Sequence, residues 1–246
     1  GNGVPDLLDE IKWGTDHLLR LQLTDGSVLS IVDEWHDSPP SAADGPSYYG
    51  PPNTSATLNT AAALAISSTV YADQLLVASI RAWKWAEANP DSLFNNNSSE
   101  YNSLSLGAGR MEINDYSRRM VKLEAACFLF EASGKDIYRE YFDQHFSEAS
   151  LIRQNSSSAY QTADLEVLLY YSKLKDGTRY AKELIKTTYL STIINGKANL
   201  PTHRNMEDPY LASIPSYTWG SNSTKSAQGN LFMNVISYQI RNEIKG

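Results

Sequence analysis

Carboxylates and aromatic rings gather in three long polar stretches of the sequence, at residues 23–55, 90–117 and 196–225. The candidate acids are Asp33, Glu34, Asp37, Asp44, Glu112, Asp115, Glu207 and Asp208, and the aromatic residues are Trp35, Tyr48, Tyr49, Tyr101, Tyr116, Tyr210, Tyr217 and Trp219. An aromatic ring offers a flat apolar face to the C–H face of a sugar. Glycoside hydrolysis usually needs one carboxylate as acid and another as base or nucleophile. The three stretches therefore indicate a sugar-binding cleft, against the alternatives of solvated loop acids and aromatic rings that fill a core.

Histidine and cysteine add little further chemistry. His36 and His203 lie in the long polar stretches and are candidates for ligand contact, whereas His17 and His145 lie in helical segments and are expected to be structural. The single cysteine, Cys127, lies in the apolar segment AACFLFEA and is expected to be a buried, inert thiol. The sequence contains no spacing typical of metal ligands, of a phosphate-binding loop or of a nucleophile elbow.

The opening segment GNGVPDLLDE allows two interpretations. Pro5, Asp6, Asp9 and Glu10 are typical of the first turn of a helix, where Pro lacks only a dispensable N–H and acidic groups face the positive end of the helix dipole. The same acids, with Asn2, also offer oxygen atoms to calcium, although the full calcium-loop pattern is absent. The helix start is favoured, and a structural calcium ion is a possible addition. No other cofactor is expected.

Composition restricts the classes of partner. The 246 residues are enough for one large domain, and the 21 basic and 28 acidic residues give a net charge of −7. Lys and Arg are scattered along the chain, which argues against nucleic acid as a partner. No run approaches the eighteen or so apolar residues that cross a bilayer, so no membrane partner is expected.

Hydrophobic periodicity predicts an all-α fold. The expected helices cover residues 5–22, 56–71, 73–89, 118–133, 135–150, 158–175, 178–195 and 226–242, with boundaries uncertain by about two to four residues. Gly134 and Gly177 lie in very short connections and are expected to be left-handed caps between antiparallel helices. The alanine-rich helix at 56–71 is expected to be an inner helix. Alternating short and long connections predict helical hairpins, with the long loops together at one end.

Several landmarks, in order, resemble glycoside hydrolase family 9, the endoglucanase family. They are GNGVPDLLDEIKWGTDHLLRLQ, DGSVLSIV, YGPPNTSATLNTAAALAISSTVY, LEAACFLFEASGKDIY and YTWGSNST. The resemblance implies an (α/α)6 barrel of six helical hairpins, of which residues 1–246 would be an incomplete part of a single catalytic domain. In the family, the segment with the catalytic base precedes the first landmark and the acid glutamate follows the last. The resemblance therefore implies that no catalytic residue lies in this chain, and the chain alone is expected to be inactive.

The resemblance also implies substrate contacts. Trp219 matches a tryptophan that lines the family's cleft, and Tyr217 shares its loop. Trp35 and His36 occupy a loop that holds sugar contacts in the family, and Asp115 precedes a helix that begins near the cleft. Met120 and Val121 stand where the family usually has an acidic pair, which puts contacts from that helix in doubt. The expected substrate-binding residues are Trp219, Tyr217, Trp35, His36, Asp115, Tyr116 and His203.

The function that this resemblance implies is hydrolysis of β-1,4-linked glucan or its oligosaccharides by an inverting acid/base mechanism. Some members remove glucosamine from chitosan oligosaccharides, so an exo-β-glucosaminidase is the first alternative. A non-catalytic carbohydrate-binding or structural helical array is the second, because helical toroids support many functions. The resemblance favours a secreted or periplasmic location, and the residues leave a cytoplasmic one open.

Overall fold

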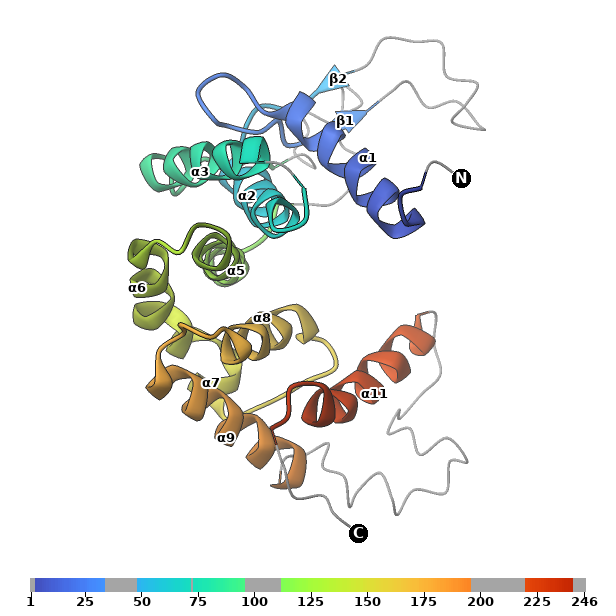
Figure 1. The fold of residues 1–246 in the computed structure, drawn as a ribbon, viewed down its shortest axis with the longest axis vertical. Coiled ribbons are helices and arrows are strands. Elements are labelled where there is room, and N and C mark those ends of the chain that lie inside the picture. The colour runs from blue at the N-terminus through green and yellow to red at the C-terminus, as the bar shows by residue number, and fades with distance from the viewer. Residues whose placement is uncertain (1–2, 34–47, 72, 96–111, 196–219, 241–246) are drawn as a thin grey trace. The chain divides into compact units, whose positions relative to one another are not determined.

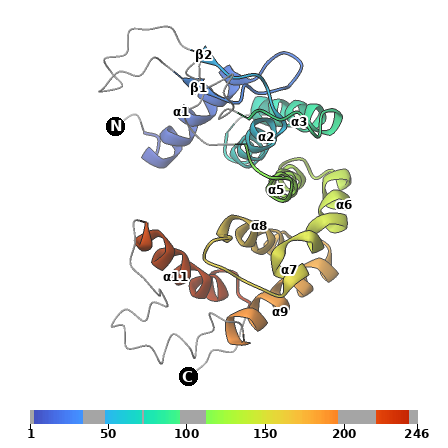
Figure 2. The same ribbon diagram turned by 180° about the vertical axis from the view of Figure 1, so that it is seen from behind.

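The computed structural model describes residues 3–33, 48–71, 73–95, 112–195 and 220–240, and most of the regular structure in these ranges is helical (Figures 1 and 2). The expectation of an all-α chain is confirmed. The chain divides into two compact units, Gly1–Lys135 and Asp136–Gly246, which are called unit 1 and unit 2 below. No helix in the described ranges has the length and the apolar character that crossing a membrane requires.

Unit 1 consists of four described helices and a short ladder. The helices are α1 (Asp6–Leu21), α2 (Thr54–Ser68), α3 (Asp73–Ala88) and α5 (Asp115–Ser133). Two strands, β1 (Val32–Asp33) and β2 (Tyr48–Tyr49), pair antiparallel with Val32 opposite Tyr49. In this unit α2 packs against both α3 and α5 (Figure 1).

Helix α2 is confirmed as the inner helix of unit 1. Leu58, Ala61, Leu64 and Ala65 are each at most 2% exposed. Its small side chains allow neighbouring helices to approach closely, and Ser79 Oγ on α3 donates a hydrogen bond to the Ala61 carbonyl at 2.6 Å. The polar residues Thr57 and Thr60 are buried in the first half of this helix, and the Thr57 hydroxyl accepts a hydrogen bond from the Val28 N–H at 3.0 Å.

Helix α1 contacts the rest of unit 1 in both halves, and the Leu8 carbonyl in its first turn accepts a hydrogen bond from the Tyr71 hydroxyl. Leu18 and Leu19 pack against a buried cluster that includes Leu64 and Leu75. After α1 the chain turns back sharply at Gly26, which has a φ of +99°. A Cβ atom at Gly26 would lie 2.6 Å from the Arg81 carbonyl oxygen on α3, so only glycine lets this turn rest on α3.

Unit 2 consists of shorter helices. They are α6 (Asp136–His145), a 3-10 turn (Phe146–Glu148), α7 (Ser150–Gln154), α8 (Thr162–Lys173), α9 (Arg179–Asn195) and α11 (Ser221–Ser237). Helices α8 and α9 form a hairpin, and α9 also contacts α7 and α11 (Figure 2).

Aromatic stacking fills the core of unit 2. The Phe142 ring on α6 stacks on Tyr171 of α8 with centroids 3.7 Å apart. The Tyr171 hydroxyl donates to Asp143 Oδ1 at 2.8 Å, and Thr178 Oγ1 donates to the other oxygen of the same carboxylate. Burial raises the pKa of Tyr171 to about 12. Asp143 therefore ties α6 to α8 and to the connection that leads into α9.

The predicted helix at 135–150 is wrong in its second half. Ala149 is extended, and the helical path ends at His145, passes through the 3-10 turn and resumes in α7. Phe146 and Leu151 are both buried, at 3% and 1% exposed. Five residues apart, they would lie about 140° from each other around one continuous α-helix. The break lets both side chains face the core.

The two predicted glycine caps have different outcomes. Gly134 ends α5 in the left-handed region with a φ of 65°, and its N–H donates to the Phe130 carbonyl at 2.8 Å, so this prediction is confirmed. The prediction for Gly177 is wrong, because it is not among the described glycines with positive φ, which are Gly3, Gly26, Gly134 and Gly220. Helix α8 instead ends at Lys173 and is capped by Leu174, which is extended.

Burial of Cys127 is confirmed. The side chain is fully buried on α5, and burial raises the pKa of the thiol. The helix start at the N-terminus is also confirmed, with Pro5 directly before Asp6, the first residue of α1. Within the described ranges, no three His, Cys, Asp or Glu side chains are close enough to hold a metal ion. Asn2 lies outside those ranges, and calcium stays a prediction.

The close contact at Gly26 predicts the effect of a methyl group there. Gly26→Ala should lower the free energy of unfolding by about 2 to 4 kcal/mol, because the left-handed backbone is strained with a Cβ and the Arg81 carbonyl must move. Gly14→Ala is the matched control, since a Cβ on that helical residue meets nothing within 4 Å. It should leave stability unchanged or raise it. Urea titrations measure both, and equal midpoints for Gly26→Ala and wild type would contradict this account of the turn.

Candidate functional site

Five of the seven expected substrate-binding residues lie outside the described ranges. They are Trp35, His36, His203, Tyr217 and Trp219. The other two, Asp115 and Tyr116, begin α5 in unit 1. The described residues therefore allow two regions to be analysed: the loop ends around the start of α5 in unit 1, and a cavity in unit 2.

Asp115 presents a carboxylate at the surface. Its side chain is 81% exposed and forms an ion pair with Arg118, whose own side chain is only 8% exposed. Arg118 Nη1 also donates to the Ile113 carbonyl at 2.6 Å. The buried guanidinium group of Arg118 thus fixes the Asp115 carboxylate by an ion pair and neutralises part of its negative charge. One turn later Met120 is buried, so it offers no surface to a ligand.

Glu112, just before α5, is the centre of a buried polar network. Its side chain is 5% exposed. Glu112 Oε2 accepts hydrogen bonds from Asn53 Nδ2 at 2.7 Å and from the Phe94 backbone N–H at 3.0 Å, and Oε1 accepts one from the Ser55 hydroxyl. Arg118 Nη1 lies 3.7 Å from Oε1. Three hydrogen bonds and one cation compensate for removing this carboxylate from water.

The partners of Glu112 come from segments far apart in the sequence. Asn53 caps α2 by accepting from the Ala56 N–H at 2.8 Å, and Phe94 follows α3. Next to them, the Thr54 N–H donates to the Ser92 carbonyl at 2.8 Å. The expectation that loops 23–55 and 90–117 meet is therefore confirmed at their described ends. Most of the third loop, at 196–225, lies outside the described residues.

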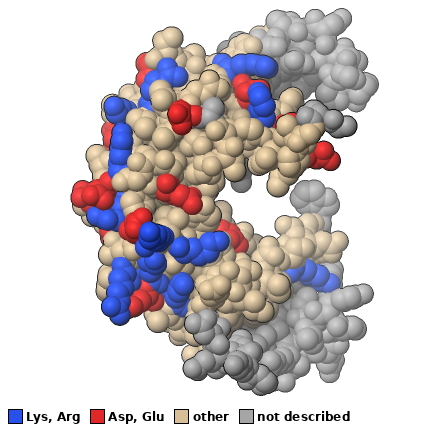
Figure 3. Space-filling view, viewed as in Figure 1, with Lys and Arg blue, Asp and Glu red and all other residues tan. Residues whose placement is uncertain are grey.

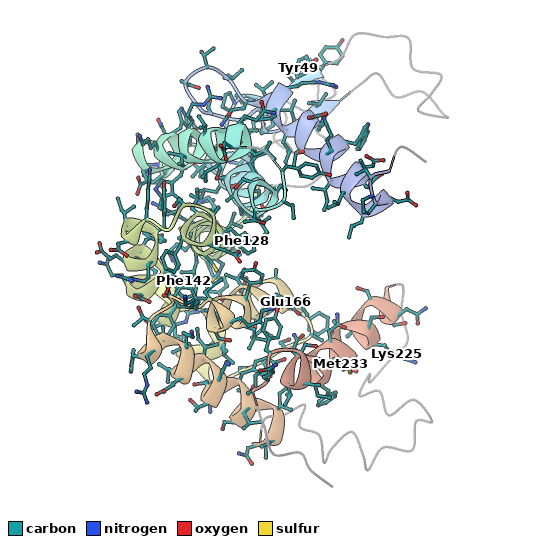
Figure 4. All side chains as sticks on the ribbon, in the orientation of Figure 1. Tyr49, Phe128, Phe142, Glu166, Lys225 and Met233 are labelled. Carbon is teal, nitrogen blue, oxygen red and sulfur yellow. The ribbon has the colours of Figure 1, made fainter. Side chains whose placement is uncertain are left out.

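Tyr48 and Tyr49 lie beside this network, on β2. Tyr49 is 56% exposed and projects away from the helices, while Tyr48 is half-buried (Figure 4). Gly50 follows them and is pressed against the ring of Phe94 and the hydroxyl of Ser30. The sequence prediction that these loop aromatics could meet a sugar is thus compatible with the exposure of Tyr49.

Unit 2 contains a cavity of about 580 Å³ between the loop that follows α7 and helices α9 and α11. This volume is within the range of small-molecule sites. The residues that line the cavity are Gln154, Asn155, Ser156, Ser157, Ser158, Ala159, Tyr160, Ser191, Thr192, Asn195, Gln228 and Leu231. None carries a charge, and most offer an amide or a hydroxyl group.

Tyr160 was not among the aromatic residues that the sequence singled out. The predicted helix at 158–175 placed it inside a helix, whereas α8 begins only at Thr162 and Tyr160 is 83% exposed. The loop is shaped by Asn155, which has a φ of 47°, and by Ser158, whose hydroxyl accepts from the Tyr160 N–H at 3.2 Å. The run of three serines before Tyr160 is the signal that a loop continues here.

A second carboxylate ties α11, which lines the cavity, to the neighbouring helix α8. Glu166 on α8 accepts from Asn234 Nδ2 at 2.8 Å and from the Tyr238 hydroxyl at 3.0 Å, which joins α8 to α11 and the residue after it (Figure 4). Tyr189 on α9 donates to the Leu231 carbonyl at 2.7 Å. Burial raises the pKa of Tyr189. The two helices that line the cavity, α9 and α11, are thus joined by a hydrogen bond, and α11 is also held by α8.

The charges of unit 2 lie elsewhere on its surface. Figure 3 shows Lys and Arg gathered over α6, α7 and α9, and the residues on these helices are Arg139, Arg153, Arg179, Lys182 and Lys186. The cavity lining offers donors and acceptors without net charge, with one aromatic ring at its edge. This chemistry suits a neutral, polyhydroxylated molecule better than an ion.

Sequence comparison identifies several relatives. The model of a family described as glycosyl hydrolase family 9 matches residues 2–244. The chain is 35% identical over 159 residues to a cellulose 1,4-β-cellobiosidase of Acetivibrio thermocellus, a match that covers 57% of this chain and 17% of that protein. It is 26% identical over 241 residues to a xyloglucan-specific endo-β-1,4-glucanase of Bacteroides ovatus, a match that covers 89% of this chain and 39% of that protein.

Solved structures show the same fold. A metagenome-derived glycoside hydrolase family 9 endoglucanase matches 98% of this chain with a TM-score of 0.75 and 23% identity. A thermostable endoglucanase from Alicyclobacillus acidocaldarius matches 93% of the chain with a TM-score of 0.66 and 17% identity. The chain spans 44% and 43% of these two structures. The expected helical hairpins of an incomplete (α/α)6 barrel are therefore confirmed as the fold class.

The exposure of Tyr160 can be measured by chemical modification. Tetranitromethane attacks the phenolate, so tyrosines with a raised pKa and a buried ring react slowly. Tyr160 should be nitrated early, together with Tyr180, which is 69% exposed, whereas Tyr171 and Tyr189 should react only after unfolding. Peptide mass spectrometry over time measures the order. Protection of Tyr160 equal to that of Tyr171 would show that this ring is covered.

Proposed function

The chain belongs to glycosyl hydrolase family 9, and on that basis we propose that it is the substrate-binding part of an enzyme that hydrolyses neutral β-1,4-linked glucans. The observation that carries the substrate class is the uncharged lining of the cavity in unit 2, with the exposed ring of Tyr160 at its edge.

The proposed reaction is hydrolysis with inversion. A carboxylic acid protonates the leaving oxygen while a carboxylate on the opposite face of the sugar activates water. We assign neither group to a residue of this chain. The role proposed for the described residues is to bind and orient the oligosaccharide, so that the bond to be cleaved meets those two groups.

Neutral substrates are favoured over amino sugars. An ammonium group that enters the cavity would lose water and meet amide and hydroxyl groups only, without a carboxylate to pair with it. The relatives are named for cellulose, cellodextrin and xyloglucan. All three names refer to glucans, which agrees with the chemistry of the cavity.

The proposed substrate contacts extend beyond the cavity. Tyr160 and Tyr49 are described, exposed aromatic residues that can stack on sugar rings. Trp219, Tyr217, Trp35, His36, Asp115, Tyr116 and His203 are kept as proposed contacts on the grounds given by the sequence. Of these, Asp115 is supported by its exposed position and its fixed partner Arg118.

An exo-β-glucosaminidase is the second candidate, and the exposed carboxylate of Asp115 favours it. An exposed acid could pair with the ammonium group of glucosamine. Asp115 already forms an ion pair with Arg118, however, so its carboxylate would attract an ammonium group more weakly than an unpaired one would. The neutral glucan therefore remains the preferred substrate.

The test compares substrates and one pair of variants in the whole protein. We expect hydrolysis of cello-oligosaccharides, followed by new reducing ends, and little or no hydrolysis of chitosan oligosaccharides. Tyr160→Ala should weaken binding of cello-oligosaccharides by about 1 to 3 kcal/mol, as loss of a stacked aromatic contact does. Tyr180→Ala removes a similarly exposed ring on α9 that does not line the cavity, and it should leave binding unchanged.

Other outcomes would replace the proposal. Preferential hydrolysis of chitosan oligosaccharides would establish the glucosaminidase instead. Binding without hydrolysis of either substrate by the whole protein would indicate a non-catalytic carbohydrate-binding array. Equal affinity for Tyr160→Ala and Tyr180→Ala would remove the cavity from the binding site.

A further inference from the structure

Glu112 is the contact that three segments of unit 1 share. Asn53 and Ser55 belong to the start of α2, Phe94 belongs to the segment after α3, and Arg118 belongs to α5. Its carboxylate is nearly inaccessible, with a side chain that is 5% exposed. The first two segments give hydrogen-bond donors to its two oxygen atoms, and α5 gives the positive charge of Arg118.

This sharing makes the three segments depend on one another. A carboxylate withdrawn from water is tolerated only while its hydrogen bonds and its cation are in place. If one segment moves away, the carboxylate loses a donor and the remaining contacts weaken. Glu112 thus favours the arrangement in which all three segments are in place together.

The network reaches the surface through Phe94 and Gly50. Glu112 fixes the Phe94 backbone, and the Phe94 ring is buried at 3% exposed. A Cβ at Gly50 would lie 2.9 Å from Phe94 Cε1, so the backbone at residue 50 rests directly on that ring. The Gly50 N–H also donates to the Ile31 carbonyl at 2.9 Å. The residue before Gly50 is Tyr49, whose ring is exposed.

We propose that Glu112 is a positioning residue, which sets the Tyr48–Tyr49 pair through Phe94 and Gly50 and thereby controls oligosaccharide affinity. The proposal rests on the proposed function for its consequence on binding. Its structural part, the control of residues 48–55 and 90–95 by one buried carboxylate, can be measured without a sugar.

The experiment uses the whole protein with Glu112→Ala, Glu112→Gln and a matched control. Glutamine can still accept the bonds from Asn53 and Phe94 with its oxygen, and its amide group can donate to Ser55. The control is Asp143→Ala in unit 2, which also removes a carboxylate that accepts two side-chain hydrogen bonds. Hydrogen exchange by mass spectrometry is measured over residues 48–55 and 90–95, together with KM and kcat on a cello-oligosaccharide well below all melting temperatures.

We expect Glu112→Ala to speed exchange in both peptides and to raise KM by about tenfold or more with a smaller change in kcat, because a displaced contact residue costs affinity. Glu112→Gln should restore most of both readouts. Asp143→Ala should lower the melting temperature and change neither readout. If Glu112→Ala exchanges as wild type does in these peptides, the positioning role is overturned.

The two proposals can fail separately. If Glu112→Ala shows faster exchange but the same KM as Asp143→Ala, the effect on affinity is overturned. The proposed hydrolysis by the wild type is not affected by that result. Faster exchange in a protein that hydrolyses no oligosaccharide would support the coupling of the three segments and overturn the proposed function alone.

Discussion

The central constraint in unit 1 is that the carboxylate of Glu112 is buried and must be compensated. Asn53, Ser55 and the Phe94 backbone supply hydrogen bonds, and Arg118 supplies the nearby positive charge. Arg118 extends the same compensation to Asp115 at the surface. The start of the inner helix α2 is thereby joined to the segments around Phe94 and Gly50, next to the exposed ring of Tyr49. The core of the unit is thus connected to its candidate binding surface.

Unit 2 uses carboxylates in a similar way but presents a different surface. Asp143 connects α6 with α8, and Glu166 connects α8 with α11. Both carboxylates bind protein groups, so neither adds charge to the lining of the cavity. The cavity is left with amides, hydroxyls and one aromatic ring. A surface of this kind can match sugar hydroxyls without a large cost for removing charged groups from water.

Periodicity predicted the helices well because burial of apolar side chains determines them. The alanine-rich α2 and the Gly134 cap follow from local sequence, and both are confirmed. The break at Ala149 could not be predicted, because it depends on two side chains, Phe146 and Leu151, that must face one core. The role of Glu112 could not be predicted either, since its hydrogen-bond donors lie 18 to 59 positions away in the sequence. Tyr160 was missed for a simpler reason: the predicted helix begins at residue 158, about one turn before α8 begins at Thr162.

The most direct measurement is a crystal structure of the whole protein with a bound cello-oligosaccharide. We expect a glucose ring stacked on Tyr160, with sugar hydroxyls bonded to amide and hydroxyl groups of the unit 2 cavity. Glu112 should keep its bonds to Asn53 and Phe94 in that complex. An oligosaccharide that does not contact Tyr160, or a cavity filled by another segment of the protein, would contradict the account.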